Sequence, residues 1–253
     1  MCVPVRETRF RVCAFSSRAE MGAAAARDAA DCFRRLLTEK KEINVLFAAA
    51  PSQNELLAAL AADRSVEWNR IHAFHMDEYV GLDRNAPQGF GNFLRDRLFR
   101  LVPFASVSYI DPAASDPDAE CARYSALLRE HPLDAVCMGI GENGHVAFND
   151  PPVADFSDPA LVKRVPLDPV CRMQQVHDGC FARLEDVPTH ALTLTVPALL
   201  SAPHHFCVVP ARTKAEAVRR TVFGPIGESC PATMLRISPD ASLYLDADSA
   251  SLL

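Results

Sequence analysis

The sequence predicts an α/β fold in which a mostly parallel sheet carries helices on both faces. Two observations predict it. Short continuous apolar runs alternate with longer amphipathic stretches along the whole chain, and the two kinds of segment have the lengths of buried strands and surface helices. With 253 residues, 49% of them hydrophobic, the chain is also long enough to bury one sizeable core.

The elements follow one another in a regular order. Ser52-Gln53-Asn54-Glu55 has the S-x-x-E pattern of a capping box, which predicts a helix start directly after the second strand. Five prolines interrupt the pattern between residues 151 and 169. No repeat or linker divides the chain, so one domain over residues 1–253 is expected. The predicted strands are 11–15, 43–50, 71–76, 107–110, 133–140, 191–196, 205–209 and 242–246, and the predicted helices are 18–40, 52–62, 88–102, 116–130 and 214–222.

Composition excludes several classes of partner. The net charge is -6 and there is no block of Lys and Arg, so nucleic acid is not expected as a partner. No apolar stretch has the length of a membrane span, so no membrane association is expected. The nine cysteines are odd in number and form no C-x-x-C pair, and the first ten residues carry charges where a leader peptide would be apolar. These features predict free thiols in a reducing, cytoplasmic compartment.

Polar clusters follow three of the predicted strands, at 49–55, 75–79 and 139–150. In open α/β sheets, ligands bind beyond the carboxyl ends of the strands. The three clusters are therefore expected to converge on one crevice.

The segment from Gly139 to Asp150 is rich in glycine at the end of a strand, which permits close approach of the backbone to a ligand. It contains His145, and Asp150 follows five residues later. Histidine can shuttle protons near neutral pH, and a carboxylate can fix its tautomer and orientation. The alternative interpretation is a structural turn with a hydrogen-bonded histidine beside a helix start.

The segment His75-Met76-Asp77-Glu78-Tyr79-Val80-Gly81-Leu82 places two acids directly after an apolar strand. A general base would be well placed there. The alternative is a helix N-terminus, where acidic side chains complement the helix dipole.

Together the two segments resemble the signatures of the glucosamine-6-phosphate deaminase family. Residues 75–82 are similar to its M-D-E-Y-V-G-L motif, and residues 139–150 are similar to its G-x-G-x-[DN]-G-H-I-A-F-N-E run. The resemblance implies a modified Rossmann-like fold, shared with 6-phosphogluconolactonases and ribose-phosphate isomerases.

The resemblance also implies roles for individual residues. Asp77 matches the family's general base, which moves a proton between C2 and C1 of the open-chain sugar. His145 matches the histidine that assists ring opening, and Asn143 and Asp150 match the residues that orient it. The family often has Asp in place of Asn143 and usually has Glu in place of Asp150, so a weaker or displaced contact to His145 is expected. The same motifs place three further residues at the substrate: Glu78, Gly141 and Gly144.

The family's phosphate loop, L-P-T-G-G-T-P, is altered in this chain. The corresponding stretch, residues 47–54, lacks both of the family's glycines, and Pro51 has no backbone N–H to donate. Ser52 and the amides of Gln53 and Asn54 are nevertheless expected to form an anion site at a helix N-terminus. The alternative is a plain capping box with no ligand. Lys214, in Val209-Pro210-Ala211-Arg212-Thr213-Lys214-Ala215, matches the family's phosphate lysine; the alternative is a solvated surface lysine. Arg172 lies in a region where the family has arginines and is expected at the substrate, but its spacing does not assign it to the phosphate.

The resemblance therefore implies an isomerising deaminase of the hydrolase class, which converts glucosamine-6-phosphate, or a close analogue, to fructose-6-phosphate and ammonia. Its partner would be a small sugar phosphate, and neither a metal nor an organic cofactor is expected, because the base has only to accept and return one proton. A homo-oligomer is one of the states left open. The alternatives are a 6-phosphogluconolactonase-like hydrolase, a non-catalytic sugar-phosphate sensor, and an isomerase of amino or neutral sugars.

Overall fold

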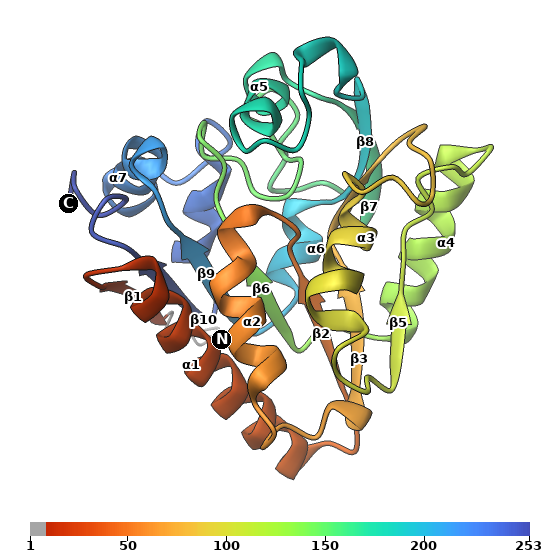
Figure 1. Ribbon diagram of the computed structural model, residues 1–253. Helices are drawn as coiled ribbons and strands as arrows, with labels where there is room; N and C mark the ends of the chain where they lie inside the picture. The colour runs from red at the N-terminus through yellow and green to blue at the C-terminus, as the bar shows by residue number, and fades with distance from the viewer. Residues whose placement is uncertain (1–8) are drawn as a thin grey trace, which may run out of the picture.

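The structure is a computed structural model and describes residues 9–253. Seven strands form one sheet in the order β1-β10-β9-β6-β2-β3-β5, and every neighbouring pair is parallel (Figure 1). The predicted mostly parallel sheet is therefore confirmed. Its strands are β1 (Arg9–Ala14), β2 (Ile43–Phe47), β3 (Ile71–His75), β5 (Ser106–Ser108), β6 (Ala135–Met138), β9 (His204–Val209) and β10 (Asp240–Leu245).

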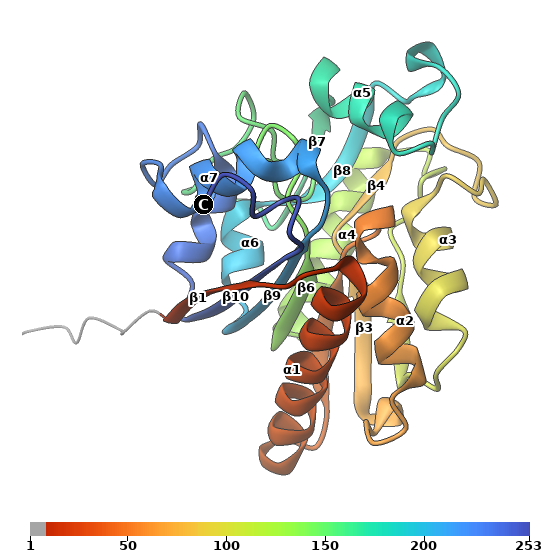
Figure 2. The same cartoon turned by 60° about the vertical axis from the view of Figure 1, so that its left-hand side comes forward.

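Helices cover both faces of this sheet (Figure 2). Successive side chains of a strand point to opposite faces, and two buried clusters result. In β2, Val45 and Phe47 pack in the cluster that contains residues of α1 and α2, whereas Leu46 packs in the cluster that contains residues of α4 and α6. The helices are α1 (Arg18–Glu39), α2 (Asn54–Ala62), α3 (Phe90–Leu94), α4 (Pro117–Glu130), α5 (Pro169–His177), α6 (Val196–Leu200) and α7 (Ala215–Phe223).

A second, antiparallel sheet contains β4 (Asp77–Tyr79), β8 (His190–Leu194) and β7 (Val162–Pro166). Neither β4 nor β7 was among the predicted strands. β7 lies in the proline-rich region and accommodates its proline by lying at the edge of the sheet. In the same region Pro169 occupies the first turn of α5, where a proline does not interrupt helical hydrogen bonding.

The chain order of the large sheet reverses beside β2. From β2 the chain runs outward through β3 to β5, and then returns to place β6 on the other side of β2. Such a switch point opens a crevice at the carboxyl ends of the two diverging strands. Among the described residues, no helix is both long and apolar enough to cross a membrane.

Candidate active site

A pocket opens at this switch point, at the carboxyl ends of β2, β6 and β9. Its wall combines the loops that follow these strands with the start of β4 and the end of α5. The predicted site residues in the wall are Ser52, Gln53, Asp77, Gly141, His145 and Lys214. The others lie outside the wall: Asn54, Glu78, Asn143, Gly144, Asp150 and Arg172.

Asp77 is the acidic residue of β4 that faces the pocket. Its side chain is 7% exposed, and no described residue donates a hydrogen bond to its carboxylate. Burial raises the pKa of Asp77 well above its ordinary value, and the neighbouring charge of Glu78 raises it further. A carboxylate in this state is a stronger base than one in water, which suits it to abstract a proton from carbon.

Glu78 points away from the pocket, because successive side chains of a strand alternate between faces. Its carboxylate accepts hydrogen bonds from the backbone amides of Tyr79 (2.9 Å), Phe90 (3.1 Å) and Gly91 (2.9 Å). Burial raises the pKa of Glu78 to about 7, against the lowering effect of those amides. Glu78 thus anchors the first turn of α3, and its position does not support the predicted contact with substrate.

His145 is held by a network of its own loop. Its Nδ1 lies 2.8 Å from Asn143 Oδ1 and 3.0 Å from Asp150 Oδ1. Both neighbours are acceptors, because Asn143 Nδ2 itself donates to Asp150 Oδ1 at 2.8 Å. The network therefore assigns the proton of neutral His145 to Nδ1 and leaves Nε2 with a free lone pair.

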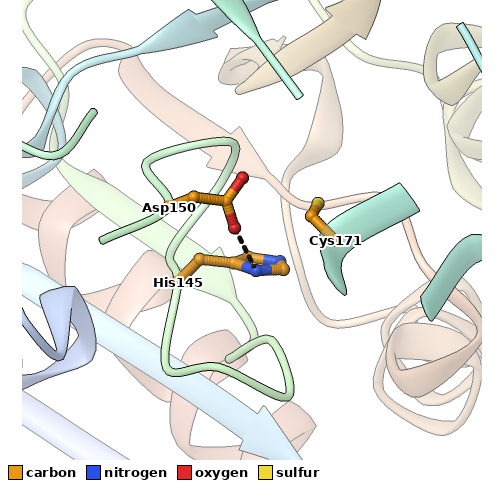
Figure 3. A group of neighbouring side chains, drawn as sticks. All are labelled: His145, Asp150 and Cys171. Atoms are coloured by element: carbon orange, nitrogen blue, oxygen red, sulfur yellow. Dashed lines mark ion pairs between the residues drawn. The ribbon is translucent and has the colours of Figure 1, made fainter. Parts of the chain in front are cut away.

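Asp150 is nearly inaccessible, with 1% of its side chain exposed. Burial acts to raise its pKa, but the hydrogen bond and the charge of His145, with the hydrogen bond from Asn143, outweigh burial and lower it. The short side chain at position 150 still reaches His145 at 3.0 Å (Figure 3). The expected weaker or displaced contact is therefore not seen.

Two glycines of this loop are required by close packing. A Cβ atom on Gly141 would overlap the His145 ring, so only glycine fits there. Gly144 has φ +90°, a conformation that favours glycine, and a Cβ on it would lie 2.7 Å from Cys230 Sγ. Gly141 thus borders the ligand pocket, whereas Gly144 faces the protein interior.

The loop after β2 differs from the predicted anion site. Residues Pro51–Gln53 form a 3₁₀ turn, in which the amide of Gln53 donates to Ala50 and the amide of Asn54 donates to Pro51. Both amides are occupied, so the prediction that they are free to hold an anion is wrong. The Asn54 side chain also lies outside the pocket, where it accepts a hydrogen bond from Arg97 at 2.6 Å.

The expected capping box is not formed either. The Ser52 hydroxyl faces the pocket and lies 3.3 Å from Gln53 Nε2, while Glu55 pairs with Arg18 at 3.1 Å. Gln53 is 1% exposed and its Oε1 has no hydrogen-bond partner among the described residues. The side chains of Ser52 and Gln53, rather than backbone amides, are therefore what this loop offers to a ligand.

Lys214 lies in the part of the pocket wall that follows β9. Its side chain is 6% exposed and makes no hydrogen bond or ion pair with the described residues, and burial lowers its pKa. The turn that leads to it is strained, because Ala211 has φ +83° in the left-handed region. Asp246 holds this turn by accepting the Ala211 amide at 3.0 Å and 3.2 Å.

Arg172 is fixed elsewhere. Its guanidinium donates to the carbonyls of Leu184 and Val187, both at 2.8 Å, and so ties α5 to the segment that follows it. It does not line the pocket.

The sequence analysis missed five polar residues of the wall: Arg18, Gln174, Gln175, Asp178 and Thr213. Gln174 holds the loop that contains His145, because its Oε1 accepts the amide of Glu142 at 2.9 Å. Gln175 is 8% exposed and its side-chain amide makes no hydrogen bond with the described residues. Two adjacent glutamines near the end of the helix that begins at Pro169 were the available signal.

The chain was then compared with known proteins. Residues 16–243 match the family described as glucosamine-6-phosphate isomerases/6-phosphogluconolactonase. A glucosamine-6-phosphate deaminase from Listeria monocytogenes serotype 4a (strain HCC23) is 35% identical over 212 residues, which are 84% of this chain and 88% of that protein. One from Streptococcus pneumoniae (strain 70585) is 35% identical over 192 residues, 76% of this chain and 79% of the relative.

Solved structures agree with these matches. A monomeric glucosamine-6-phosphate deaminase superposes with a TM-score of 0.87 at 27% identity, over 96% of this chain and all of that one. A 6-phosphogluconolactonase from Trypanosoma brucei superposes with a TM-score of 0.79 at 17% identity, over 98% of this chain and all of that one, which shows a shared fold alone.

Proposed function

Because the chain belongs to the family of glucosamine-6-phosphate isomerases and 6-phosphogluconolactonases, we propose that its pocket carries out the isomerising deamination for which its more similar relatives are named. The reaction converts glucosamine-6-phosphate and water to fructose-6-phosphate and ammonia. The observation that supports it most strongly is that one pocket contains both a buried carboxylate with a raised pKa, Asp77, and a histidine with a free Nε2, His145.

The proposed sequence begins with ring opening. His145 Nε2 accepts the proton of the C1 hydroxyl, and a proton returned to the ring oxygen completes the open-chain aldehyde. The Asn143–Asp150 network stabilises the positive charge that His145 carries between the two transfers. Asn143 and Asp150 thus act through His145 and need no contact with substrate.

Asp77 then performs the isomerisation. Its carboxylate takes the proton from C2 while the C1 oxygen gains a proton from the C2 ammonium group, which gives an enolamine, and the proton taken from C2, or one from solvent, is then delivered to C1. The product is an imine at C2, which water cleaves to the ketose and ammonia. The C–N bond is broken by water, so we expect the enzyme to be classed as a hydrolase. The reaction involves no net oxidation or reduction of the substrate, so no organic cofactor is required.

The substrate phosphate is proposed to lie against Lys214 and the Ser52 hydroxyl. Lys214 is a buried cation without a protein partner, and such a group is stabilised by an anionic ligand. The polar side chains of Gln53 and Gln175 also lack partners and are available to sugar hydroxyl groups. We also propose that the chain acts as one domain in the cytoplasm.

Ammonia release from a panel of substrates tests the function. The panel contains glucosamine-6-phosphate, galactosamine-6-phosphate, free glucosamine and 6-phosphogluconolactone, with fructose-6-phosphate measured in parallel. We expect equal amounts of ammonia and fructose-6-phosphate from the first substrate, and little turnover of the unphosphorylated sugar. Hydrolysis of the lactone without ammonia release from any amino sugar would assign the chain to the other activity of its family.

A further inference from the structure

Three side chains with different metal-binding atoms meet beside the pocket (Figure 3). They are the imidazole of His145, the carboxylate of Asp150 and the thiol of Cys171, and one potential ligand atom of each lies within 4.8 Å of the others. All three side chains are buried, with 8%, 1% and 1% exposed respectively. No metal was expected from the sequence, in which Cys171 is distant from the other two residues and reaches them only through the packing of α5.

The Asp150 carboxylate is the member of this group that lacks a partner. Its Oδ1 accepts from Asn143 and lies beside His145, but its buried Oδ2 has no hydrogen-bond partner among the described residues. The neighbouring Cys171 thiol is at best a weak donor. A buried carboxylate oxygen without a strong donor is costly, and a bound cation would remove that cost.

The separations suit a small cation. Zinc binds nitrogen, oxygen and sulfur at about 2.0–2.3 Å, which places tetrahedral ligand atoms about 3.3–3.8 Å apart. His145 Nδ1 and Asp150 Oδ1 are 3.0 Å apart, and the whole group lies within 4.8 Å, so a shift of about 1 Å in side-chain position would complete the geometry. A mixed N, O, S set favours Zn²⁺ over Mg²⁺ and Ca²⁺, which prefer oxygen ligands throughout.

We propose that His145, Asp150 and Cys171 form an inhibitory site for a thiophilic divalent cation, with Zn²⁺ as the best match. On binding, the Cys171 thiol loses its proton to solvent and its sulfur bonds to the cation. The proton on His145 Nδ1 moves to Nε2, so that the Nδ1 lone pair can bind the metal. His145 then has no free lone pair facing the pocket and cannot accept a proton. Because the thiol proton is released, binding should weaken as the pH falls.

Direct metal binding tests the proposal without relying on turnover. The metal-free protein is titrated with Zn²⁺ against a chromophoric chelator, and Co²⁺ serves as a spectroscopic probe, since cobalt–thiolate bonds give charge-transfer absorption in the near ultraviolet. The native protein should show this band and release a proton on binding. Failure here would leave the deaminase proposal intact, because that proposal is tested by ammonia release.

Variants identify the site. Cys171→Ala should remove the cobalt–thiolate band and weaken Zn²⁺ binding by more than the about 10- to 100-fold that a supporting contact contributes. Cys171→Ser, which keeps the side-chain size, should lose the band as well. Cys180→Ser is the matched control: Cys180 lies in the same segment but outside the group, so binding should be unchanged.

Inhibition of ammonia release should follow the binding results. Zn²⁺ should inhibit the native enzyme and the Cys180→Ser variant at the same concentrations, and Mg²⁺ should not inhibit. Equal zinc affinity in the native and Cys171→Ala proteins would overturn the proposal, as would the absence of a cobalt–thiolate band in the native protein. Equal inhibition by Mg²⁺ would overturn it too, because it would indicate a site made of oxygen ligands alone.

Discussion

Two parts of the pocket wall differ in whether the protein itself fixes the side-chain groups that face the pocket. In the loop after β6, His145 Nδ1 is fixed by Asn143 and Asp150 at 2.8 Å and 3.0 Å. In the loops after β9 and β2, Lys214 makes no hydrogen bond or ion pair with the described residues, and Gln53 Oε1 is buried without a hydrogen-bond partner among them. The difference indicates that the His145 network is preorganised before substrate arrives. The polar groups of Lys214 and Gln53, by contrast, gain partners only when the substrate binds.

This comparison divides the expected effects of mutation. Substitutions in the His145 network or at Asp77 should lower kcat, because they remove groups that act in the transition state. Substitution of Lys214 should raise KM, because it removes a contact that is equally strong in the ground state and in the transition state. The predictions below test this division.

The largest effect is expected for Asp77→Asn. The amide keeps the shape of the side chain but cannot accept the C2 proton, so kcat should fall by about 10²- to 10⁴-fold with KM little changed. Steady-state ammonia release from glucosamine-6-phosphate measures both constants. Native kcat in this variant would remove Asp77 from the role of base.

The second largest effect concerns the network around His145. His145→Ala should lower kcat by about 10²-fold or more. Addition of Asp150→Asn to that variant should lower it little further, because residues that act as a unit give non-additive losses. The four proteins of this double-mutant cycle are compared by kcat. Additive losses would show that Asp150 has a function independent of His145.

Lys214→Ala should act on binding. Loss of one charge-assisted contact costs about 1.5–3 kcal/mol, so KM for glucosamine-6-phosphate should rise by about 10- to 150-fold, with a smaller change for the free sugar. Arg212→Ala is the matched control, since Arg212 lies in the same turn but is exposed and outside the pocket wall. If both variants bind substrate equally well, the phosphate does not lie against Lys214.

The smallest effect is a shift in pH dependence. The charge of Glu78 raises the pKa of Asp77, so Glu78→Gln should lower it. Asp77 is active when ionised, and activity is lost as the pH falls through its pKa. The acid limb of the kcat profile should therefore move to lower pH in the variant. An acid limb that stays in place would show that another group controls it.

Much of the fold, and most of the residues proposed to act in catalysis, could be predicted from the sequence. The continuous apolar runs of β2 and β6 identify parallel strands, and glycines around His145 indicate a tight loop. The side-chain directions at β4 could also have been inferred, because adjacent residues of a strand face opposite sides, which separates Glu78 from Asp77. A three-residue strand, however, is too short to show that alternation as a pattern.

The residues proposed to bind the substrate could not be predicted in the same way. Whether the amides of Gln53 and Asn54 are free depends on the turn type, and Pro51 begins a 3₁₀ turn that occupies them. Gln175 and Cys171 reach the site only because α5 begins within the proline-rich region and packs over the pocket. Such placement depends on tertiary packing, which local sequence does not encode.

Loss of deuterium from C2 of labelled glucosamine-6-phosphate tests most directly whether the chain isomerises its substrate through Asp77. The native enzyme should remove deuterium from C2 as ammonia appears, and more slowly than it turns over unlabelled substrate, because the C–D bond breaks more slowly. The Asp77→Asn variant should bind the substrate and leave the deuterium in place. Retention of deuterium by the native enzyme, or its loss at the native rate in the variant, would contradict proton transfer by Asp77.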